Sequence, residues 1–179
     1  MNFKYQKIIL SGKRCTGKST LLWELQKRLN YPIFSISMFL RDYIRQYHLS
    51  EKEVDEKRVE LAKDIDMRIL NLIQGDNACL IEAKIFGQLK EKFPQTCNIL
   101  LTADEKIQYQ RDAFREGIDL QKAKDRVEKK ENEWYPKMAQ IYGFNDFFDP
   151  KYYDLVVDTT QLTREQVADK VFEWLKILV

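Results

Sequence analysis

A glycine-rich segment between two apolar stretches constrains the fold of this chain more than any other feature. The segment "SGKRCTGKST" follows the apolar run "KIIL" and precedes the run "LLWELQKRL". Gly12, Gly17, Lys18 and Ser19 satisfy the pattern G-x-x-x-x-G-K-[ST]. The two flanking runs supply the strand and the helix that this pattern requires. We therefore predict a strand, a phosphate-binding loop and a helix at the start of the chain.

The residue types in this segment suit a phosphate cradle. Glycine permits the backbone angles that point successive N–H groups at one anion. Lys18 supplies a positive charge for the β- and γ-phosphates, the Ser19 hydroxyl can ligate Mg²⁺, and the helix N-terminus favours an anion. The segment thus predicts binding of a nucleoside triphosphate, and at the variable positions Lys13 and Arg14 are expected to be solvated. The predicted nucleotide-binding residues are Gly12, Lys13, Arg14, Cys15, Thr16, Gly17, Lys18, Ser19 and Thr20.

Short apolar runs alternate with longer amphipathic segments along the chain. The expected strands are Ile8–Ser11, Ile33–Ser35, Ala78–Glu82, Asn98–Thr102 and Asp154–Val157. Several are apolar throughout, as strands covered on both faces should be. Thr163 and Gln166 have the spacing of a capping box before a C-terminal helix. Strand alternating with helix predicts an α/β fold, with a parallel sheet covered by helices on both sides.

The segment 111–137 differs from the rest of the chain. It is almost saturated with charged residues and has few large apolar ones. We expect an exposed helical excursion there rather than a part of the core.

The composition limits the class of protein. The 179 residues fit a single domain over 1–179, and 44% apolar with 32% charged residues is ordinary for a globular protein. A formal net charge of +2 argues against a protein that holds nucleic acid mainly by charge. No apolar run approaches the roughly 20 residues of a membrane span, and no signal peptide is evident. We expect a cytoplasmic protein that acts on small molecules, without a membrane partner.

Cysteine and histidine exclude several kinds of site. Cys15, Cys79 and Cys97 are widely spaced and form no CxxC pair, which suits a reducing compartment. His48 is the only histidine, and it lies in a polar stretch. A histidine-rich zinc site is excluded, and Ser-His or Cys-His nucleophilic catalysis is disfavoured.

The loop alone does not separate kinases from GTPases and ATPases. A GTPase needs a guanine-reading NKxD-like segment after a later strand, and "ILLTADEK" does not provide one. Motor-type ATPases are normally larger and end a strand with a carboxylate pair. Here the expected strand Ala78–Glu82 ends in a single carboxylate. Glu82 either holds the hydration shell of Mg²⁺ or simply starts the next loop.

The remaining segments resemble the archaeal-type cytidylate kinases, small members of the P-loop nucleoside monophosphate kinases. The resemblance rests on "IFSISMFLRDYIRQ", "GDNACLIEAKIFG", the long stretch from "LTADEK" to "IYGFND", and "YYDLVVDTTQLTREQV", and it covers nearly the whole chain. It implies a three-layer, adenylate-kinase-like fold with a five-stranded parallel sheet. It also implies an acceptor-binding helical region at about 36–75 and a lid at 111–137.

The resemblance implies phosphoryl transfer from ATP, with Mg²⁺, to a nucleoside monophosphate, with CMP or dCMP as the first choice. The acceptor phosphate attacks in line, so the reaction needs arranged positive charge and no protein nucleophile. The implied catalytic residues are Lys18, Arg41, Arg111 and Arg115. The implied substrate-binding residues are Ser35, Arg41, Arg68 and Lys84, and the implied metal-binding residues are Ser19 and Glu82.

Three of these arginines, Arg111, Arg115 and Arg68, also have a plainer interpretation. Arg111 and Arg115 lie four apart and either reach the donor nucleotide or form a solvated helix face. Arg68 either meets the acceptor or lies on a helix surface. Arg41 stands where the family holds the acceptor phosphate.

The chain also departs from the family pattern. The family's Glu-Gly-Arg is Glu82-Ala83-Lys84 here, and lysine cannot form the two-pronged contact of arginine with a phosphate. Met38 replaces the acid of the acceptor loop. These departures leave two alternatives open: a P-loop kinase for another small acceptor, and a nucleotide-binding regulatory module with little catalysis. Measuring turnover with a panel of acceptors distinguishes these two alternatives from a nucleoside monophosphate kinase.

Overall fold

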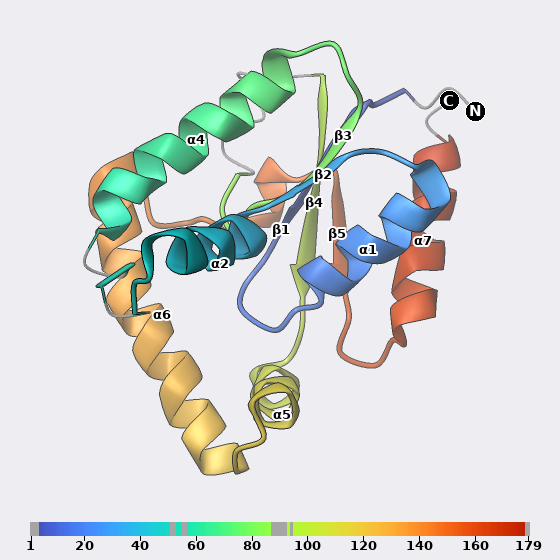
Figure 1. Ribbon diagram of the computed structural model, residues 1–179. Coiled ribbons are helices and arrows are strands. Elements are labelled where there is room, and N and C mark those ends of the chain that lie inside the picture. The colour runs from blue at the N-terminus through green and yellow to red at the C-terminus, as the bar shows by residue number, and fades with distance from the viewer. Residues whose placement is uncertain (1–3, 51–52, 55–56, 87–92, 94, 178–179) are drawn as a thin grey trace.

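A five-stranded parallel sheet forms the centre of the molecule. The structure, a computed structural model, describes residues 4–50, 53, 54, 57–86, 93 and 95–177. The strands have the spatial order β2-β3-β1-β4-β5, with β1 in the middle (Figure 1). Their bounds are Lys7–Ser11 for β1, Ile33–Ser35 for β2, Cys79–Glu82 for β3, Thr96–Thr102 for β4 and Leu155–Asp158 for β5. The predicted α/β fold and the five predicted strands are confirmed.

Helices cover both faces of this sheet, as predicted. Helices α1 and α7 lie on one face, and α2 and α4 lie on the other (Figure 1). The helices are α1 Lys18–Leu29, α2 Ile36–Tyr47, α4 Arg58–Gln74, α5 Glu105–Glu116, α6 Leu120–Tyr142 and α7 Arg164–Ile177, with a 3-10 turn, η2, at Pro150–Tyr152. None of the helices in this described part of the chain is long and apolar enough to cross a membrane.

Successive side chains of β1 point to opposite faces of the sheet, so β1 contributes to the core on both sides. Ile8 and Leu10 are buried against α1 and α7, whereas Ile9 is buried against α4. Every residue of β1 and β3 is buried, because both faces of the central strands are covered. This packing fixes the carboxyl end of β1, from which the glycine-rich loop leaves.

The capping box predicted before α7 is present. The Thr163 N–H donates to Gln166 Oε1 at 2.9 Å, and the Gln166 N–H donates to Thr163 Oγ1 at 3.2 Å. Two N–H groups that lack helical partners are thereby satisfied. Helix α7 begins at Arg164, directly after Thr163, and packs on α1.

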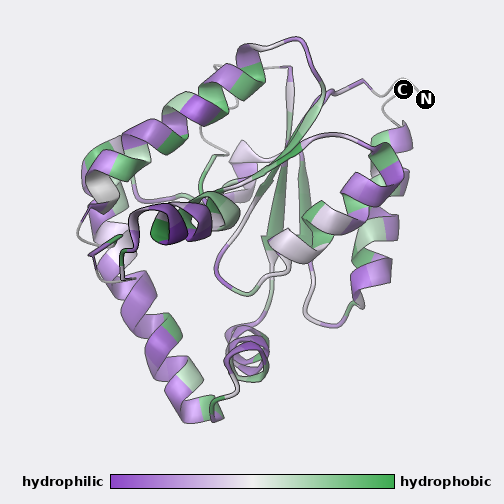
Figure 2. Ribbon diagram, in the orientation of Figure 1, coloured by the Kyte–Doolittle hydropathy of each residue, from purple (hydrophilic) through white to green (hydrophobic). Residues whose placement is uncertain are grey.

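The predicted lid segment, 111–137, comprises the end of α5, a turn and most of α6. It projects beyond the carboxyl ends of the strands (Figure 1), and its ribbon is largely hydrophilic (Figure 2). The predicted helices are confirmed, but the segment is not wholly exposed. Asp112, Ala123 and Val127 are buried, because α5 and α6 pack on one another. Its role as a lid stays a prediction, as does the acceptor-binding region, whose residues 51–52 and 55–56 lie outside the described residues.

Candidate active site

The glycine-rich loop has the backbone that its sequence predicts. Gly12 has φ +143°, and a Cβ atom there would lie 2.3 Å from the carbonyl oxygen of Leu101 on β4. Gly17, directly before α1, has φ +95°, and Cys15 has φ +59°. L residues adopt such angles only with strain. The loop therefore turns tightly against β4 and leads into the N-terminus of α1, where N–H groups can bind an anion.

Two side chains hold the loop closed from within. The ammonium group of Lys18 donates to the carbonyl oxygen of Lys13 at 2.7 Å, and the Thr16 hydroxyl donates to the same oxygen at 3.0 Å. Burial lowers the pKa of Lys18, and the charges of Glu82 and Glu131 oppose that shift. Lys18 is thus placed at the loop with two carboxylates nearby.

Glu82 ends β3 and faces the end of β2. The sheet register pairs it with Ser35, and its Oε2 accepts hydrogen bonds from the hydroxyls of Ser35 and Ser37, the latter at 3.0 Å. Ser35 also accepts the Met38 N–H at 3.3 Å and so caps α2. The carboxylate of Glu82 is therefore oriented by two serines, one of which, Ser37, sequence reasoning did not single out.

The donors around the loop fit a magnesium nucleotide. Ser19 lies exposed in the first turn of α1, and Glu82 is buried yet close enough to influence Lys18. In the described part of the chain, no group of three or more cysteine, histidine or acidic side chains is arranged to hold a metal ion. A metal here would therefore depend on phosphate oxygens and water as well as Ser19 and Glu82, which is how Mg²⁺ is commonly bound beside a nucleotide.

Arg111 joins two loops at the base of the predicted lid. Its Nη1 donates to the Cys15 carbonyl at 3.2 Å and to Thr159 Oγ1 at 2.9 Å, and its Nη2 donates to the Thr159 carbonyl at 2.6 Å. Thr159 is buried, and its hydroxyl also reaches the Thr16 carbonyl at 3.1 Å. Arg111 therefore contacts the phosphate loop through backbone atoms, and the interpretation of a merely solvated residue is wrong.

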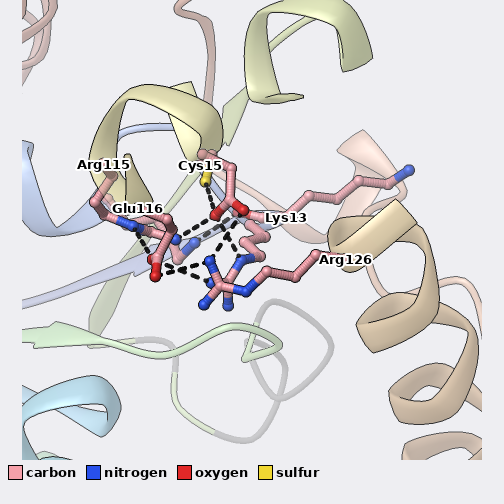
Figure 3. Close-up of polar contacts among 8 residues, drawn as sticks. Lys13, Cys15, Arg115, Glu116 and Arg126 are labelled. Atoms are coloured by element: carbon pink, nitrogen blue, oxygen red, sulfur yellow. Dashed lines mark hydrogen bonds and ion pairs between the residues drawn. The ribbon is translucent and has the colours of Figure 1, made fainter. Parts of the chain in front are cut away.

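Arg115 belongs to a cluster around the buried carboxylate of Asp112 (Figure 3). Arg14 from the loop donates to Asp112 Oδ1 at 3.1 Å, Arg115 donates to the same oxygen, and Arg126 from α6 donates to Oδ2 at 3.2 Å. Glu116 lies beside them, with Arg126 at 2.9 Å. The expectation that Arg14 is solvated is therefore wrong, since its side chain is held by this buried carboxylate. Lys13 is partly exposed, 3.9 Å from Glu105.

Cys15, the remaining loop side chain, also faces this cluster. Its thiol donates to Asp112 Oδ1 at 3.4 Å (Figure 3). Burial raises the pKa of Cys15, so the thiol stays protonated and acts as a donor.

A pocket of about 130 Å³ opens between α2, α4, α6 and the segment after β3. Most of its walls are aliphatic or aromatic. Its polar groups include Asp66, which accepts a hydrogen bond from the Tyr142 hydroxyl at 2.8 Å. Burial raises the pKa of Asp66. The lining residues are Ile36, Leu40, Leu61, Ala62, Ile65, Asp66, Ile69, Ala83, Lys84, Ile85, Phe86, Trp134, Met138 and Tyr142.

Lys84 connects this pocket to the phosphate loop. Its carbonyl oxygen accepts the Gly12 N–H at 3.3 Å, while its side chain lines the pocket. The ammonium nitrogen lies 3.9 Å from the ring centre of Trp134 and 4.7 Å from that of Tyr135, both on α6. Aromatic faces attract a cation at these distances.

Arg41 and Arg68 lie on the two helices that border this pocket, α2 and α4. Both are exposed, and neither is among the described residues that line the pocket. The Arg41 Nε donates to the Ser37 carbonyl one turn earlier at 3.2 Å, and the Arg68 guanidinium lies 4.8 Å from the ring centre of Phe39. Their predicted contacts with the acceptor stay predictions.

Sequence reasoning missed several groups that the fold brings together. Asp112 and Glu116 lie in a segment where charge is so dense that neither residue stands out. Thr159 and Asp66 likewise belong to no short motif. A signal existed only for Trp134, a large aromatic residue within an otherwise charged stretch.

The comparisons with known proteins agree with this arrangement. Residues 8–135 match the family model described as AAA domain. A cytidylate kinase of Saccharolobus islandicus is 26% identical over 174 residues, covering 96% of this chain and 91% of that protein. A cytidylate kinase of Sulfolobus acidocaldarius is 29% identical over 166 residues, covering 91% of this chain and 90% of that protein.

Solved structures share the fold at lower identity. Shikimate kinase from Bacteroides thetaiotaomicron superposes with a TM-score of 0.62 at 14% identity, over 96% of this chain and 97% of that one. The loop, the strand order and these matches point the same way. The chain belongs to the AAA domain family, in which it is a cytidylate-kinase-like P-loop kinase.

Proposed function

We propose that the protein transfers the γ-phosphoryl group of ATP to a nucleoside monophosphate, with CMP or dCMP as the preferred acceptor. The observation that carries the proposal is the position of Lys84. Its backbone bonds to Gly12 of the phosphate loop, and its side chain lines the adjoining pocket. One residue thus lies at the boundary between a triphosphate site and a site of acceptor size.

On the donor side, the N–H groups of the loop and the Lys18 ammonium hold the phosphates of ATP. Ser19 and Glu82 hold Mg²⁺, directly or through water, and the ion when bound offsets the negative charge of the β- and γ-phosphates. Ser35 and Ser37 keep the Glu82 carboxylate in one orientation. These groups position the triphosphate and leave its γ-phosphorus open to attack.

On the acceptor side, the pocket suits a single six-membered ring. The pocket measures about 130 Å³, a little below the roughly 150 Å³ of a cavity that admits benzene, so its size favours a single pyrimidine ring over the two fused rings of a purine. Cytosine presents an amino group, a donor, where uracil presents a carbonyl oxygen, an acceptor. A carboxyl oxygen of Asp66 can accept from the amino group but not from the uracil oxygen. Support for a cytosine base thus comes from pocket size and from Asp66 together.

The transfer itself needs orientation and charge. An oxygen of the acceptor phosphate attacks the γ-phosphorus in line, a new P–O bond forms, and the bond to the β-phosphate oxygen breaks to release ADP. In this proposal Lys18 acts on the donor side and Lys84 on the acceptor side, and their positive charges offset the charge of the two phosphates. The only histidine, His48, is exposed and takes no part.

A panel of acceptors tests the proposal directly. ADP release is measured with ATP and each of CMP, dCMP, UMP, AMP and GMP. We expect turnover with CMP or dCMP to exceed turnover with UMP by at least tenfold in kcat/KM. Equal rates with all five nucleotides, or no turnover with any, would contradict the acceptor assignment.

Asp66→Asn sharpens this test, because an amide can also donate to the oxygen of uracil. The variant should lose most of the discrimination between CMP and UMP. Asp64→Asn is a matched control, since Asp64 is an exposed acid two residues earlier on α4. An unchanged CMP-to-UMP ratio in Asp66→Asn would remove Asp66 from base recognition.

A second candidate is a kinase for a small hydroxyl acceptor. The observations that favour it are the shikimate kinase fold match and the largely apolar pocket wall. Adding shikimate and gluconate to the same panel distinguishes the two, because only this candidate gives turnover with a compound that lacks a phosphate. Binding of ATP without turnover of any acceptor would select the remaining alternative, a regulatory nucleotide-binding module.

A further inference from the structure

Three arginines from separate parts of the chain meet at one buried carboxylate beside the phosphate loop. Arg14 belongs to the loop, Arg115 to α5 and Arg126 to α6, and all three bond to Asp112, which has no exposed surface. Figure 3 labels Arg115, Arg126 and Glu116 in this cluster. The two oxygens of Asp112 accept hydrogen bonds from different donors. Oδ1 accepts from Arg14, Arg115 and the Cys15 thiol, and Oδ2 accepts from Arg126.

Positive charge is concentrated in this cluster. Glu116 adds a second carboxylate, 2.9 Å from both Arg115 Nε and Arg126 Nη1. Three guanidinium groups are thus gathered around Asp112 and Glu116. Arg111, one residue before Asp112, adds a fourth and is bonded to the Cys15 carbonyl. Guanidinium groups gathered next to an anion-binding loop favour the binding of an anion.

Asp112 and Glu116 both contact all three arginines, Glu116 reaching Arg14 Nη2 at 3.8 Å, but Asp112 is fully buried at the centre of the cluster. Without Asp112, three long, like-charged side chains that start from three elements would repel one another and keep only the more exposed Glu116 as a common partner. Each arginine would then have to be ordered when the nucleotide arrives. Charges that are already oriented cost no reorganisation when a phosphoryl group moves, which is the condition for electrostatic catalysis.

We propose that Asp112 is a positioning residue for the donor nucleotide. Its carboxylate holds Arg14, Arg115 and Arg126 in one arrangement next to the phosphate loop, so that the triphosphate meets arginines that are already in place. This inference rests on the proposed use of ATP as the donor. It does not depend on which compound accepts the phosphoryl group.

Asp112→Asn tests the inference through kcat and KM separately. The amide keeps the size of the side chain but cannot balance the arginines. The variant gains net positive charge beside the triphosphate, so KM for ATP should not rise. Because the arginines are no longer held, kcat should fall at least tenfold. Asp125→Asn on the exposed side of α6 is the control, since Asp125 bonds to the Gln121 side chain and should leave both constants unchanged.

A purely structural carboxylate would give a different result. Less of the protein would be folded, but kcat per folded molecule, measured by active-site titration, would match the wild-type value. That outcome overturns the inference. A kcat equal to or above the wild-type value overturns it too, because Asp112 would then compete with the nucleotide for the arginines.

Arg126→Gln provides a second test in case Asp112→Asn does not fold. Arg126 is partly exposed on α6, and its replacement leaves the carboxylate with Arg14 and Arg115. We expect kcat to fall about tenfold, whereas Lys122→Gln, one turn earlier on α6 and bonded to Asp119, should retain the wild-type value. If Arg126→Gln behaves like Lys122→Gln, the inference is wrong. The effects of Asp112→Asn and Arg126→Gln should also be less than multiplicative in the double variant.

The failure of this inference differs from the failure of the proposed function. Transfer to CMP with wild-type kcat in Asp112→Asn supports the function and refutes the inference. If no acceptor is found, the same kcat and KM comparison is made on slow hydrolysis of ATP, and a tenfold loss of kcat there supports the inference alone. Absence of both transfer and hydrolysis contradicts both.

Discussion

The donor and acceptor halves of the candidate site are built in different ways. The phosphate loop of the donor half consists of consecutive residues, Gly12 to Thr20, and its shape comes mainly from backbone angles at glycines packed against β4. The acceptor pocket is assembled from side chains of α2, α4, α6 and the segment after β3. A local sequence pattern can therefore specify this loop, although Glu82 and the cluster around Asp112 come from other elements. The second half depends on how distant elements pack, and one substitution there can change the ligand.

Lys18→Ala should have the largest effect, because it removes the donor-side charge at the moving phosphoryl group. We expect kcat to fall at least about 10²–10³-fold, measured by ADP release. Lys27→Ala, at an exposed position of α1 paired with Glu24, should keep wild-type activity. The two variants should have similar far-ultraviolet circular dichroism. Near-wild-type turnover in Lys18→Ala would show that chemistry does not occur at this loop.

Gly12→Ala tests whether the close packing of the loop backbone against β4 is needed for the fold of the donor half. The new Cβ would lie 2.3 Å from the Leu101 carbonyl oxygen, so β4 or the loop must move. We expect the free energy of unfolding to fall by about 3 kcal/mol or more. Gly17→Ala is the matched control, because it has a positive φ but open space, and should cost only about 1–2 kcal/mol. Equal losses in urea denaturation would mean that the clash is relieved and that only backbone angle matters.

Substitutions of Lys84 test the acceptor half, where side chains determine how the acceptor is bound. Lys84→Met keeps the apolar contact with Trp134 but removes the charge, and should lower kcat/KM for the acceptor about tenfold with KM for ATP unchanged. Lys84→Arg offers a two-pronged contact to the acceptor phosphate and should raise kcat/KM a few-fold. Indifference to both substitutions would show that Lys84 serves only to pack against the aromatic rings of α6.

Asp66 gives the smallest effect, a dependence of stability on pH. Burial raises its folded-state pKa above the unfolded value of 3.8. Folding therefore favours the protonated form, and that stability is lost as the pH rises through the folded-state pKa. Asp66→Asn should match wild-type stability below pH 3.8 and exceed it slightly at pH 7, whereas Asp64→Asn should not. A stability difference that does not change between pH 3 and pH 7 would refute the shift.

Most of the fold was predictable because it follows local rules. Apolar runs located the five strands to within two residues at each end, and the Thr163–Gln166 spacing located the start of α7. The contact of Arg14 is one that local rules do not predict. The pattern treats its position as variable, but its side chain bonds to a carboxylate 98 residues later in the chain. Convergence of that kind is a property of packing, and no spacing in the sequence encodes it.

Helix α6 extends from one half of the candidate site to the other. Arg126, near its beginning, belongs to the cluster around Asp112, while Trp134, Met138 and Tyr142 line the acceptor pocket. Its 23 residues span about 34 Å as one element. If the helix shifts when one substrate binds, we expect the affinity for the other to change, and thermodynamic linkage makes that change equal in both directions. Measuring the affinity for ATP with and without CMP, and for CMP with and without an ATP analogue, would give the size of the coupling free energy that one helix transmits.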